Sequence, residues 1–424
     1  MNTRVGRLTK EERSWVLYDV ANSAFTLIVV TTIMPIFFGN VAAAGTASNR
    51  ATALWGYTNS IASILLAVSA PVLGAIADYA GMKRRLFLIF LSTGVVVTLL
   101  FATIGEGMIG YATILYVVGF FAYSGANLVY DSFLTDVTTR GRLDPVSTRG
   151  FAWGYIGSVV PFLVVLLLVT RPDLVGGSLA ATRISFVITA SWWLGFSVPM
   201  IRNVNQTYSM PREQHQIRTA FVRIVTTFKH IRRHREAFLF LIAYFFYIDG
   251  VDTIIRMATI YGTEVGLGQT ELILAVLAIQ VVAFPFALLY GQLAKRFGTK
   301  PMLFAGIAVY FVIVVLGFFL PVFASGEVQR MVFWAMAFLV ATSQGGIQAL
   351  SRSYFGALIP KERAGEFFGF YNIFGKFAAI LGPALLGLMA DITGESRWGV
   401  LSLALLFAVG AIILTQVRKS DAMT

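Results

Sequence analysis

The chain alternates long apolar segments with short polar connections over its whole length. An α-helix needs about 20 mainly apolar residues to cross a bilayer, and each segment is at least that long or close to it. We therefore expect twelve membrane helices, six on each side of a polar stretch that begins near residue 202. The predicted helices lie at residues 14–38, 53–79, 86–104, 109–136, 150–170, 180–201, 237–261, 269–294, 302–322, 329–357, 364–389 and 396–417.

The composition leaves little room for anything besides these helices. Of 424 residues, 57% are hydrophobic and 13% are charged, far from the usage of soluble domains. Cysteine is absent, and His215, His230 and His234 all fall in the central polar stretch. We therefore expect no disulfide, no cofactor and no metal site in a span, and no enzyme of the nucleophile or metal type.

The distribution of basic residues predicts the orientation. Of the 33 Lys and Arg residues, 25 fall in the termini and connections of one side, which the positive-inside rule places in the cytoplasm. Both termini are thus expected to be cytoplasmic. We further expect a multi-pass, monomeric protein in a bacterial inner membrane. The same bias accounts for the pI of about 9.9 without nucleic-acid binding.

Three regions follow from this pattern: an N-terminal bundle at residues 1–201, a linker at 202–236 and a C-terminal bundle at 237–424. In the linker, apolar residues at helical spacing alternate with basic ones between residues 217 and 233, which predicts an amphipathic helix on the membrane surface. Two roles remain open for it: a tether between the bundles, or a binding site for a regulator or an anionic lipid.

The two halves of the chain repeat each other. The stretch Gly74-x-x-x-Asp78-x-x-Gly81-x-Lys83-Arg84 matches Gly291-x-x-x-Lys295-x-x-Gly298-x-Lys300. The first helices of the halves also match. In this alignment, Asp19, Asn22 and Thr26 correspond to Asp249, Asp252 and Arg256. A parallel duplication of six helices is typical of transporters.

The first of these stretches resembles the loop signature of the major facilitator superfamily. Within it, the chain resembles the vacuole effluxer-like branch, which comprises autophagy-related amino-acid exporters and bacterial relatives. The matching segments are Ser14-Trp-x-Leu-Tyr-Asp-x-Ala-Asn-Ser-Ala-Phe25, Asp249-Gly-Val251, Gly345-Gly-Ile-Gln-Ala-Leu-Ser-Arg-Ser353 and Glu366-Phe-Phe-Gly-Phe-Tyr-Asn372. Lys295 departs from the loop signature, and sugar-porter and peptide-porter signatures are absent.

The resemblance implies an all-α membrane fold of two pseudo-symmetric six-helix bundles. It also implies that predicted helices 1, 4, 7 and 10 line a central cavity, and that Asp78 sits at the start of helix 11, near Gly365. We expect Gly74 to permit close helix packing and Gly81 a turn. Together with Lys83 and Arg84, these loop residues are expected to form part of a gate.

Seven charged residues lie inside the predicted helices, and each costs about 2.5 to 3.5 kcal/mol near the bilayer centre. They are Asp19, Asp131, Asp249, Asp252, Arg256, Arg352 and Lys376. Six of them lie on the four helices that the resemblance assigns to the cavity. They are therefore expected to meet water or substrate, although ion pairs between helices would also account for any one of them.

Depth separates these charges into two sets. Asp19, Asp131 and Arg352 lie about 8 Å inside the cytoplasmic ends of their helices, which favours a gate. Asp131 and Arg352 occupy equivalent repeat positions, so we predict that they pair in the outward-facing state, with Asp19 as a further partner.

The deeper set, on predicted helix 7, favours substrate binding. There Arg256 can hold a carboxylate while Asp249 or Asp252 receives an ammonium group; alternatively Asp252 and Arg256 neutralise each other. Asp249, and after it Asp19, is the candidate for proton coupling, because no histidine lies in a span. Further candidates for substrate contact are Asn22, Gln280, Gln344, Gln348, Asn372 and Lys376.

These features favour a secondary transporter that works by alternating access. The resemblance suggests export of amino acids or similar small polar solutes, with protons as the coupling ion. Efflux of amphipathic drugs is the alternative within transport, and a non-transporting scaffold or sensor is the alternative outside it. Direct use of ATP is disfavoured, because the sequence has no phosphate-binding loop of the Gly-x-x-x-x-Gly-Lys-Ser/Thr type.

Overall fold

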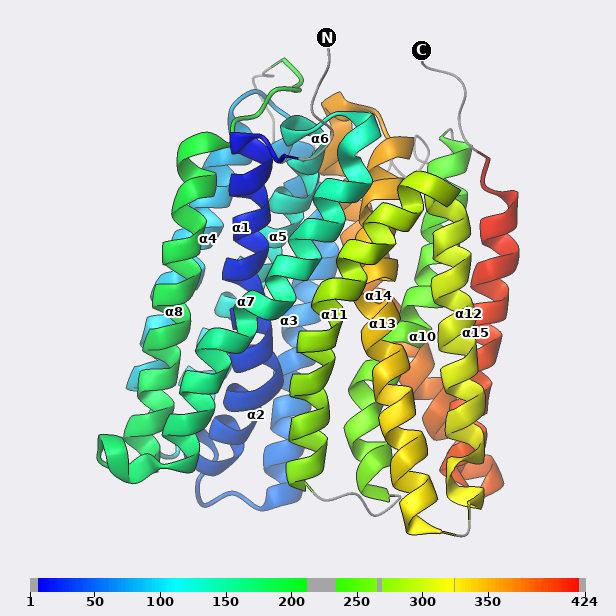
Figure 1. The fold of residues 1–424 in the computed structure, drawn as a ribbon. Helices are drawn as coiled ribbons and strands as arrows, with labels where there is room; N and C mark the ends of the chain where they lie inside the picture. Colours follow the sequence, from blue (N-terminus) through cyan, green and yellow to red (C-terminus); the bar gives the residue numbers. More distant parts are fainter. Residues whose placement is uncertain (1–6, 212–233, 265–268, 324, 419–424) are drawn as a thin grey trace. The chain divides into compact units, whose positions relative to one another are not determined.

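The computed structural model describes residues 7–211, 234–264, 269–323 and 325–418, and nearly all of them are helical (Figure 1). In the first half the longer helices are α1 (Lys10–Ala24), α3 (Ser48–Ala77), α4 (Met82–Leu100), α5 (Ile109–Ser132), α7 (Leu143–Thr170) and α8 (Ser178–Asn203). In the second half they are α10 (Arg235–Glu264), α11 (Gln269–Phe297), α12 (Thr299–Phe319), α13 (Gly326–Leu358), α14 (Ala364–Thr393) and α15 (Ser396–Gln416).

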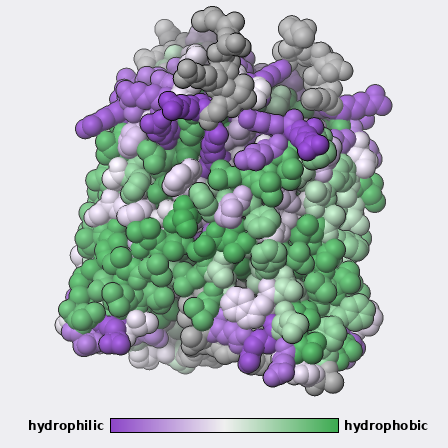
Figure 2. Space-filling view, viewed as in Figure 1, coloured by the Kyte–Doolittle hydropathy of each residue, from purple (hydrophilic) through white to green (hydrophobic). Residues whose placement is uncertain are grey.

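The surfaces of these helices are those of a membrane protein. Large apolar side chains such as Ile64, Val68 and Ile412 are more than half exposed, and Figure 2 shows hydrophobic residues over the middle of the helices and hydrophilic ones near their ends. Among the described residues, ten helices are long and apolar enough to cross a membrane. The all-α membrane fold is confirmed. The count of twelve stays a prediction, because α13 and α14, at the two remaining predicted spans, are not among the ten.

Each half packs in the same pattern, as a duplication requires. In the first half α1 packs on α8, and α5 packs on both α3 and α4. In the second half α10 packs on α15, and α13 packs on both α11 and α12. The loops after α3 and α11 turn at Gly81 and Gly298, whose φ angles of +74° and +92° favour glycine. The turn expected at Gly81 is present at both equivalent positions.

Packing divides the chain into two compact units. Unit 1 comprises Met1–Thr139, Trp153–Phe221 and Lys361–Gly369, and unit 2 comprises Arg140–Ala152, Val222–Pro360 and Phe370–Thr424. Helices α7 and α14 thus each begin in one unit and continue in the other. The division into bundles at 1–201 and 237–424 stays a prediction. Packing assigns Arg140–Ala152 to unit 2 and Lys361–Gly369 to unit 1. The amphipathic linker helix predicted around residues 217–233 lies outside the described residues.

The first membrane helix is not α-helical throughout. It begins with a capping box, in which Thr9 and Glu12 bond each other's backbone N–H groups. It then passes into a π-helix at Phe25–Ile33, the short α2 (Met34–Phe37) and a second π-helical turn at Phe38–Ala42. Pro35 removes a backbone donor there, and the hydroxyl of Thr31 bonds the carbonyl of Thr26, five residues back. The membrane helix predicted at 14–38 is present, and it is π-helical over Phe25–Ile33.

Candidate functional site

A row of polar side chains joins α1 to α5 within unit 1. The Tyr130 hydroxyl donates to Asp19 Oδ2 at 2.6 Å, and Asn22 Nδ2 donates to Asn127 Oδ1 at 3.0 Å. The next rung is a 2.5 Å hydrogen bond between the Thr26 and Tyr123 hydroxyls. We call these six residues, with Asp131, the polar stripe of unit 1.

Four of the seven residues of this stripe are not buried, whereas Asp19, Asn22 and Tyr130 are. Thr26 is exposed, and Tyr123, Asn127 and Asp131 are half-buried at intervals of four residues on α5. Polar side chains facing lipid would be costly, so this face of α1 and α5 is suited to a water-filled cavity. Helix α7 lies close beside it, since a Cβ on Gly154 would come within 2.7 Å of Ser23 Oγ.

Helix α13 carries the equivalent row in unit 2. Gln344, Gln348 and Arg352 follow the same spacing of four. In the repeat alignment they correspond to Tyr123, Asn127 and Asp131. The two glutamines are half-buried, while Arg352 is buried. We call these three residues the polar stripe of unit 2. It carries a cation at the position where the stripe of unit 1 carries a carboxylate.

Arg352 is held by the first turns of α7, which belong to the same unit. Its Nε donates to Ser147 Oγ at 3.0 Å and its Nη2 to the Ser147 carbonyl at 3.2 Å. The guanidinium also lies 4.4 Å from the centroid of the Phe151 ring. These contacts orient the guanidinium, and its predicted pairing with Asp131, a residue of unit 1, stays a prediction.

Asp249 accepts hydrogen bonds from Thr253 of its own helix and from the backbone of α14. It is fully buried on α10, and its Oδ2 accepts the Gly382 N–H of α14 at 2.9 Å. Pro383 follows directly and lacks an N–H, so the carboxylate lies where the backbone ladder of α14 is interrupted. Asp252, one turn along α10, is half-buried. Asp252 is thus the more accessible of the two predicted partners for an ammonium group.

The remaining predicted contacts are more dispersed. Gln280 on α11 and Asn372 on α14 are half-buried, as a cavity or a helix interface would allow. The side chains of Arg256 and Lys376 lie outside the described residues. Among the described residues, no group of three or more His, Asp and Glu side chains is arranged to hold a metal ion.

Asp78 lies at the start of α14, within unit 1. Its two oxygens accept the N–H groups of Gly365 at 2.6 Å and Glu366 at 2.8 Å. The helices meet closely here, because a Cβ on Gly74 would collide with the Gly365 carbonyl oxygen. Burial raises the pKa of Asp78 to about 7, although Lys83 and the two N–H groups oppose the shift. This is the arrangement that the loop resemblance implies; its gating role stays a prediction.

Lys83 has a partner that the sequence did not indicate. The ammonium group is buried with Asp136, at 2.6 Å from Oδ2, and also donates to the Ser132 carbonyl. The exposed Arg84 instead donates to the Ile201 carbonyl. Asp136 was overlooked because it ends the predicted helix, where a carboxylate is unremarkable. Tyr123 and Asn127 were overlooked too, although their spacing of four with Asp131 on an apolar helix was a usable signal.

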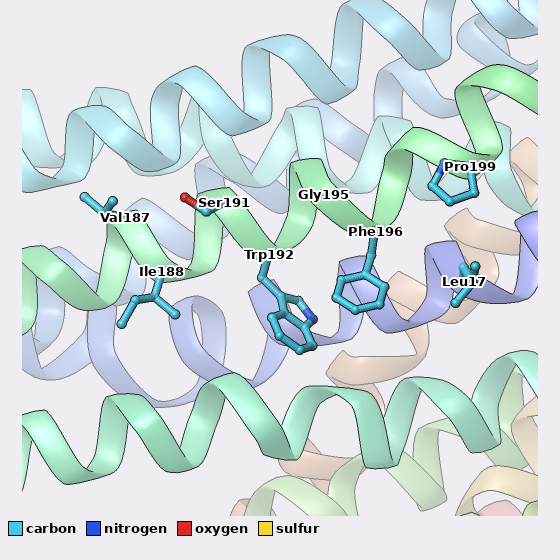
Figure 3. A pocket seen from close by; sticks show the side chains of 8 residues that line it. All are labelled: Leu17, Val187, Ile188, Ser191, Trp192, Gly195, Phe196 and Pro199. Atoms are coloured by element: carbon cyan, nitrogen blue, oxygen red, sulfur yellow. The ribbon is translucent and has the colours of Figure 1, made fainter.

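A separate apolar groove of about 560 Å³ lies between α1 and α8 (Figure 3). Trp192 and Phe196 project from α8 on the side of Leu17, and Trp192 Nε1 donates to the Val20 carbonyl at 3.2 Å. Its other lining residues are Val187, Ile188, Ser191, Gly195 and Pro199. With one hydroxyl and no charge, this lining suits an apolar chain rather than a polar solute.

Comparison with known proteins agrees with the fold. The family described as "Vacuole effluxer Atg22 like" matches residues 44–142 and 135–424. The uncharacterized MFS-type transporter YxiO of Bacillus subtilis (strain 168) is 48% identical over 417 residues, covering 97% of this chain and 96% of that protein. Autophagy-related protein 22 of Saccharomyces cerevisiae (strain ATCC 204508 / S288c) is 22% identical over 492 residues, covering 97% and 92%.

Among solved structures, the proton:xylose symporter XylE bound to 6-bromo-6-deoxy-D-glucose superimposes with a TM-score of 0.75 at 13% identity, over 96% of this chain and 95% of that one. At this identity the likeness concerns the fold alone. The sequence matches extend over nearly the whole chain and agree with that fold. The chain therefore belongs to the vacuole effluxer Atg22-like family of major facilitator superfamily transporters, which are multi-pass membrane proteins and not enzymes.

Proposed function

We propose that this transporter exports amino acids or similar small polar solutes by alternating access, driven by protons. The observation that carries the proposal is the pair of polar stripes at equivalent positions of the repeat. A zwitterion needs both an anionic and a cationic partner, and the stripes with α10 supply carboxylates, amides and a guanidinium on helices that are otherwise apolar. The family description, which names an effluxer, supports export.

Proton coupling is assigned to Asp249. Its carboxylate accepts a backbone N–H of α14 beside Pro383, and a carboxylate is a stronger acceptor than a protonated carboxyl. Uptake of a proton would therefore weaken the hold of α10 on α14. Because α14 begins in unit 1 and continues in unit 2, this contact can couple protonation to a change between the units.

Counterflow in proteoliposomes tests the substrate class. Vesicles loaded with a mixture of unlabelled amino acids are expected to accumulate labelled amino acids in a saturable way. Arg256→Ala should abolish accumulation of carboxylate substrates, whereas Arg330→Ala, which removes a partly exposed pair with Glu271, should not. Accumulation of amphipathic dyes but not of amino acids would favour drug efflux, and no saturable flux of any solute would favour a scaffold.

A further inference from the structure

The chain does not leave unit 1 directly when α8 ends. Residues 204–210, which we call the linker strap, fold back over the loop that follows α3. Gln206 Nε2 donates to the Ala77 carbonyl at 3.1 Å, and Gln206 Oε1 accepts the Lys83 N–H at 3.3 Å. Met210 then pairs with this loop as a short β-bridge, its N–H donating to the Asp78 carbonyl at 2.8 Å. The strap is thus bonded to the backbone on both sides of Asp78.

Asp136 attaches the strap to the buried ion pair. Its Oδ1 accepts the N–H groups of Thr207 and Tyr208, each at 2.8 Å, while Oδ2 binds Lys83. A buried ion pair needs such additional hydrogen bonds to offset its desolvation. The strap therefore helps to fix Lys83, which lies five residues after Asp78.

The other edge of the strap reaches the segment that opens α14. Lys361 Nζ donates to the Tyr208 hydroxyl at 3.2 Å and lies 4.6 Å from the centroid of the Tyr208 ring. Three residues later α14 begins, and its Gly365 and Glu366 N–H groups bind Asp78. Strap and loop thus hold the start of α14 at neighbouring points, within one unit.

We propose that the linker strap acts as a latch, which holds the start of α14 to unit 1 and releases it during the transport cycle. Gln206 and Tyr208 are positioning residues that act through Asp78 and Lys361. The proposal rests on alternating access. Helix α14 passes from unit 1 to unit 2 after Gly369, so whatever releases its start from unit 1 changes the link between the units. The central linker then has a mechanical role besides tethering.

The latch contains one contact that stays formed and one that can break. Lys83 and Asp136 are fully buried and stay paired, because separating them would leave uncompensated buried charges. Tyr208 and Lys361 are half-buried, and a cation-π contact at such a site is weak enough to break and re-form within a cycle. The breakable step therefore lies between strap and α14.

Thiol labelling of the full-length protein tests the latch without knowledge of the solute. The chain has no cysteine, so Thr26→Cys, at an exposed position of the unit 1 stripe, can report accessibility from each side of oriented vesicles. Tyr208→Ala, Gln206→Ala and Lys361→Met should each raise the ratio of labelling from the linker side to labelling from the opposite side by about 3- to 10-fold. Tyr208→Phe, which keeps the ring, should give a smaller change.

The controls separate a latch from general loss of structure. Asn205→Ala removes an exposed amide next to Gln206 and should leave the ratio unchanged. Combining Tyr208→Ala with Lys361→Met should give no more than the larger single effect, since both remove one contact. An unchanged ratio in Lys361→Met and Tyr208→Phe, which keep most of the packing, would overturn the latch. A shifted ratio in a protein without saturable flux would keep the latch and refute the transport proposal instead.

Discussion

At the scale of single residues, three carboxylates accept backbone N–H groups and so fix the position of a helix or loop. Asp78 and Asp249 both hold α14 in this way, at Gly365 and at Gly382. A third carboxylate, Asp136, holds the linker strap. Backbone donors are fixed in place, so each carboxylate defines a position along a helix or loop more sharply than a flexible lysine would.

Asp78 makes stability depend on pH. Its pKa is about 7 in the folded protein and about 3.8 when solvated, so the folded state holds the proton more tightly between these values. Folding is then favoured at low pH, and this contribution falls as pH rises from about 4 to about 7, by up to about 1.4 kcal/mol per pH unit. We expect the melting temperature of the parent, relative to Asp78→Asn, to fall between about pH 4 and 7 and to level off above. A constant difference across this range would contradict the assignment.

The proposed coupling role of Asp249 can be tested by removing its ability to titrate. Asp249→Asn keeps an acceptor oxygen for the Gly382 N–H but cannot gain or lose a proton, so exchange of solute should continue while gradient-driven accumulation is lost. Flux measurements with and without an imposed pH gradient distinguish these modes. If the gradient still drives flux in this variant, the coupling role passes to Asp19, and Asp19→Asn is the matched comparison.

At the scale of elements, α7 and α14, the helices that pass from one unit to the other, each begin in contact with a glycine. The two glycines occupy equivalent positions of the repeat. The start of α14 meets Gly74 of α3, and the start of α7 meets Gly291 of α11. The obstacles differ: a Cβ on Gly74 meets the Gly365 carbonyl, which is backbone, whereas one on Gly291 meets the Thr148 side chain. The same repeat position therefore tolerates change to different degrees.

This difference predicts unequal costs for the same substitution. Gly74→Ala should destabilise the protein by about 1 to 3 kcal/mol, because two helix backbones must move apart. Gly291→Ala should cost less, and adding Thr148→Ala should recover part of that cost by providing space. Thermal unfolding in detergent measures all three variants. Equal losses for the two glycine variants, with no recovery by Thr148→Ala, would refute this packing argument.

At the scale of the whole molecule, equivalent positions of the two repeat halves can carry opposite charges. Asp131 and Arg352 are equivalent in the alignment and opposite in sign. If they pair in the outward-facing state, each neutralisation, Asp131→Asn or Arg352→Gln, should favour the inward-facing state. Exchanging them, by Asp131→Arg with Arg352→Asp, should recover part of the lost transport. Recovery should be incomplete, because the Ser147 and Phe151 contacts suit a guanidinium. A doubly exchanged variant no better than the singles would count against the pair.

The sequence alone determined the fold class, the repeat and the family, because spans need long apolar segments and internal duplication keeps its spacing. It also identified Asp78, Gly81 and the charged residues inside the predicted helices. Only the tertiary structure decided the partners: Asp136 for Lys83, Tyr130 for Asp19, and Gly382 for Asp249. Backbone donors carry no sequence signal, and residues 53 to 133 positions apart become neighbours only when helices pack. For the same reason the linker strap was not foreseeable, because Gln206 and Tyr208 contact residues far away in the sequence.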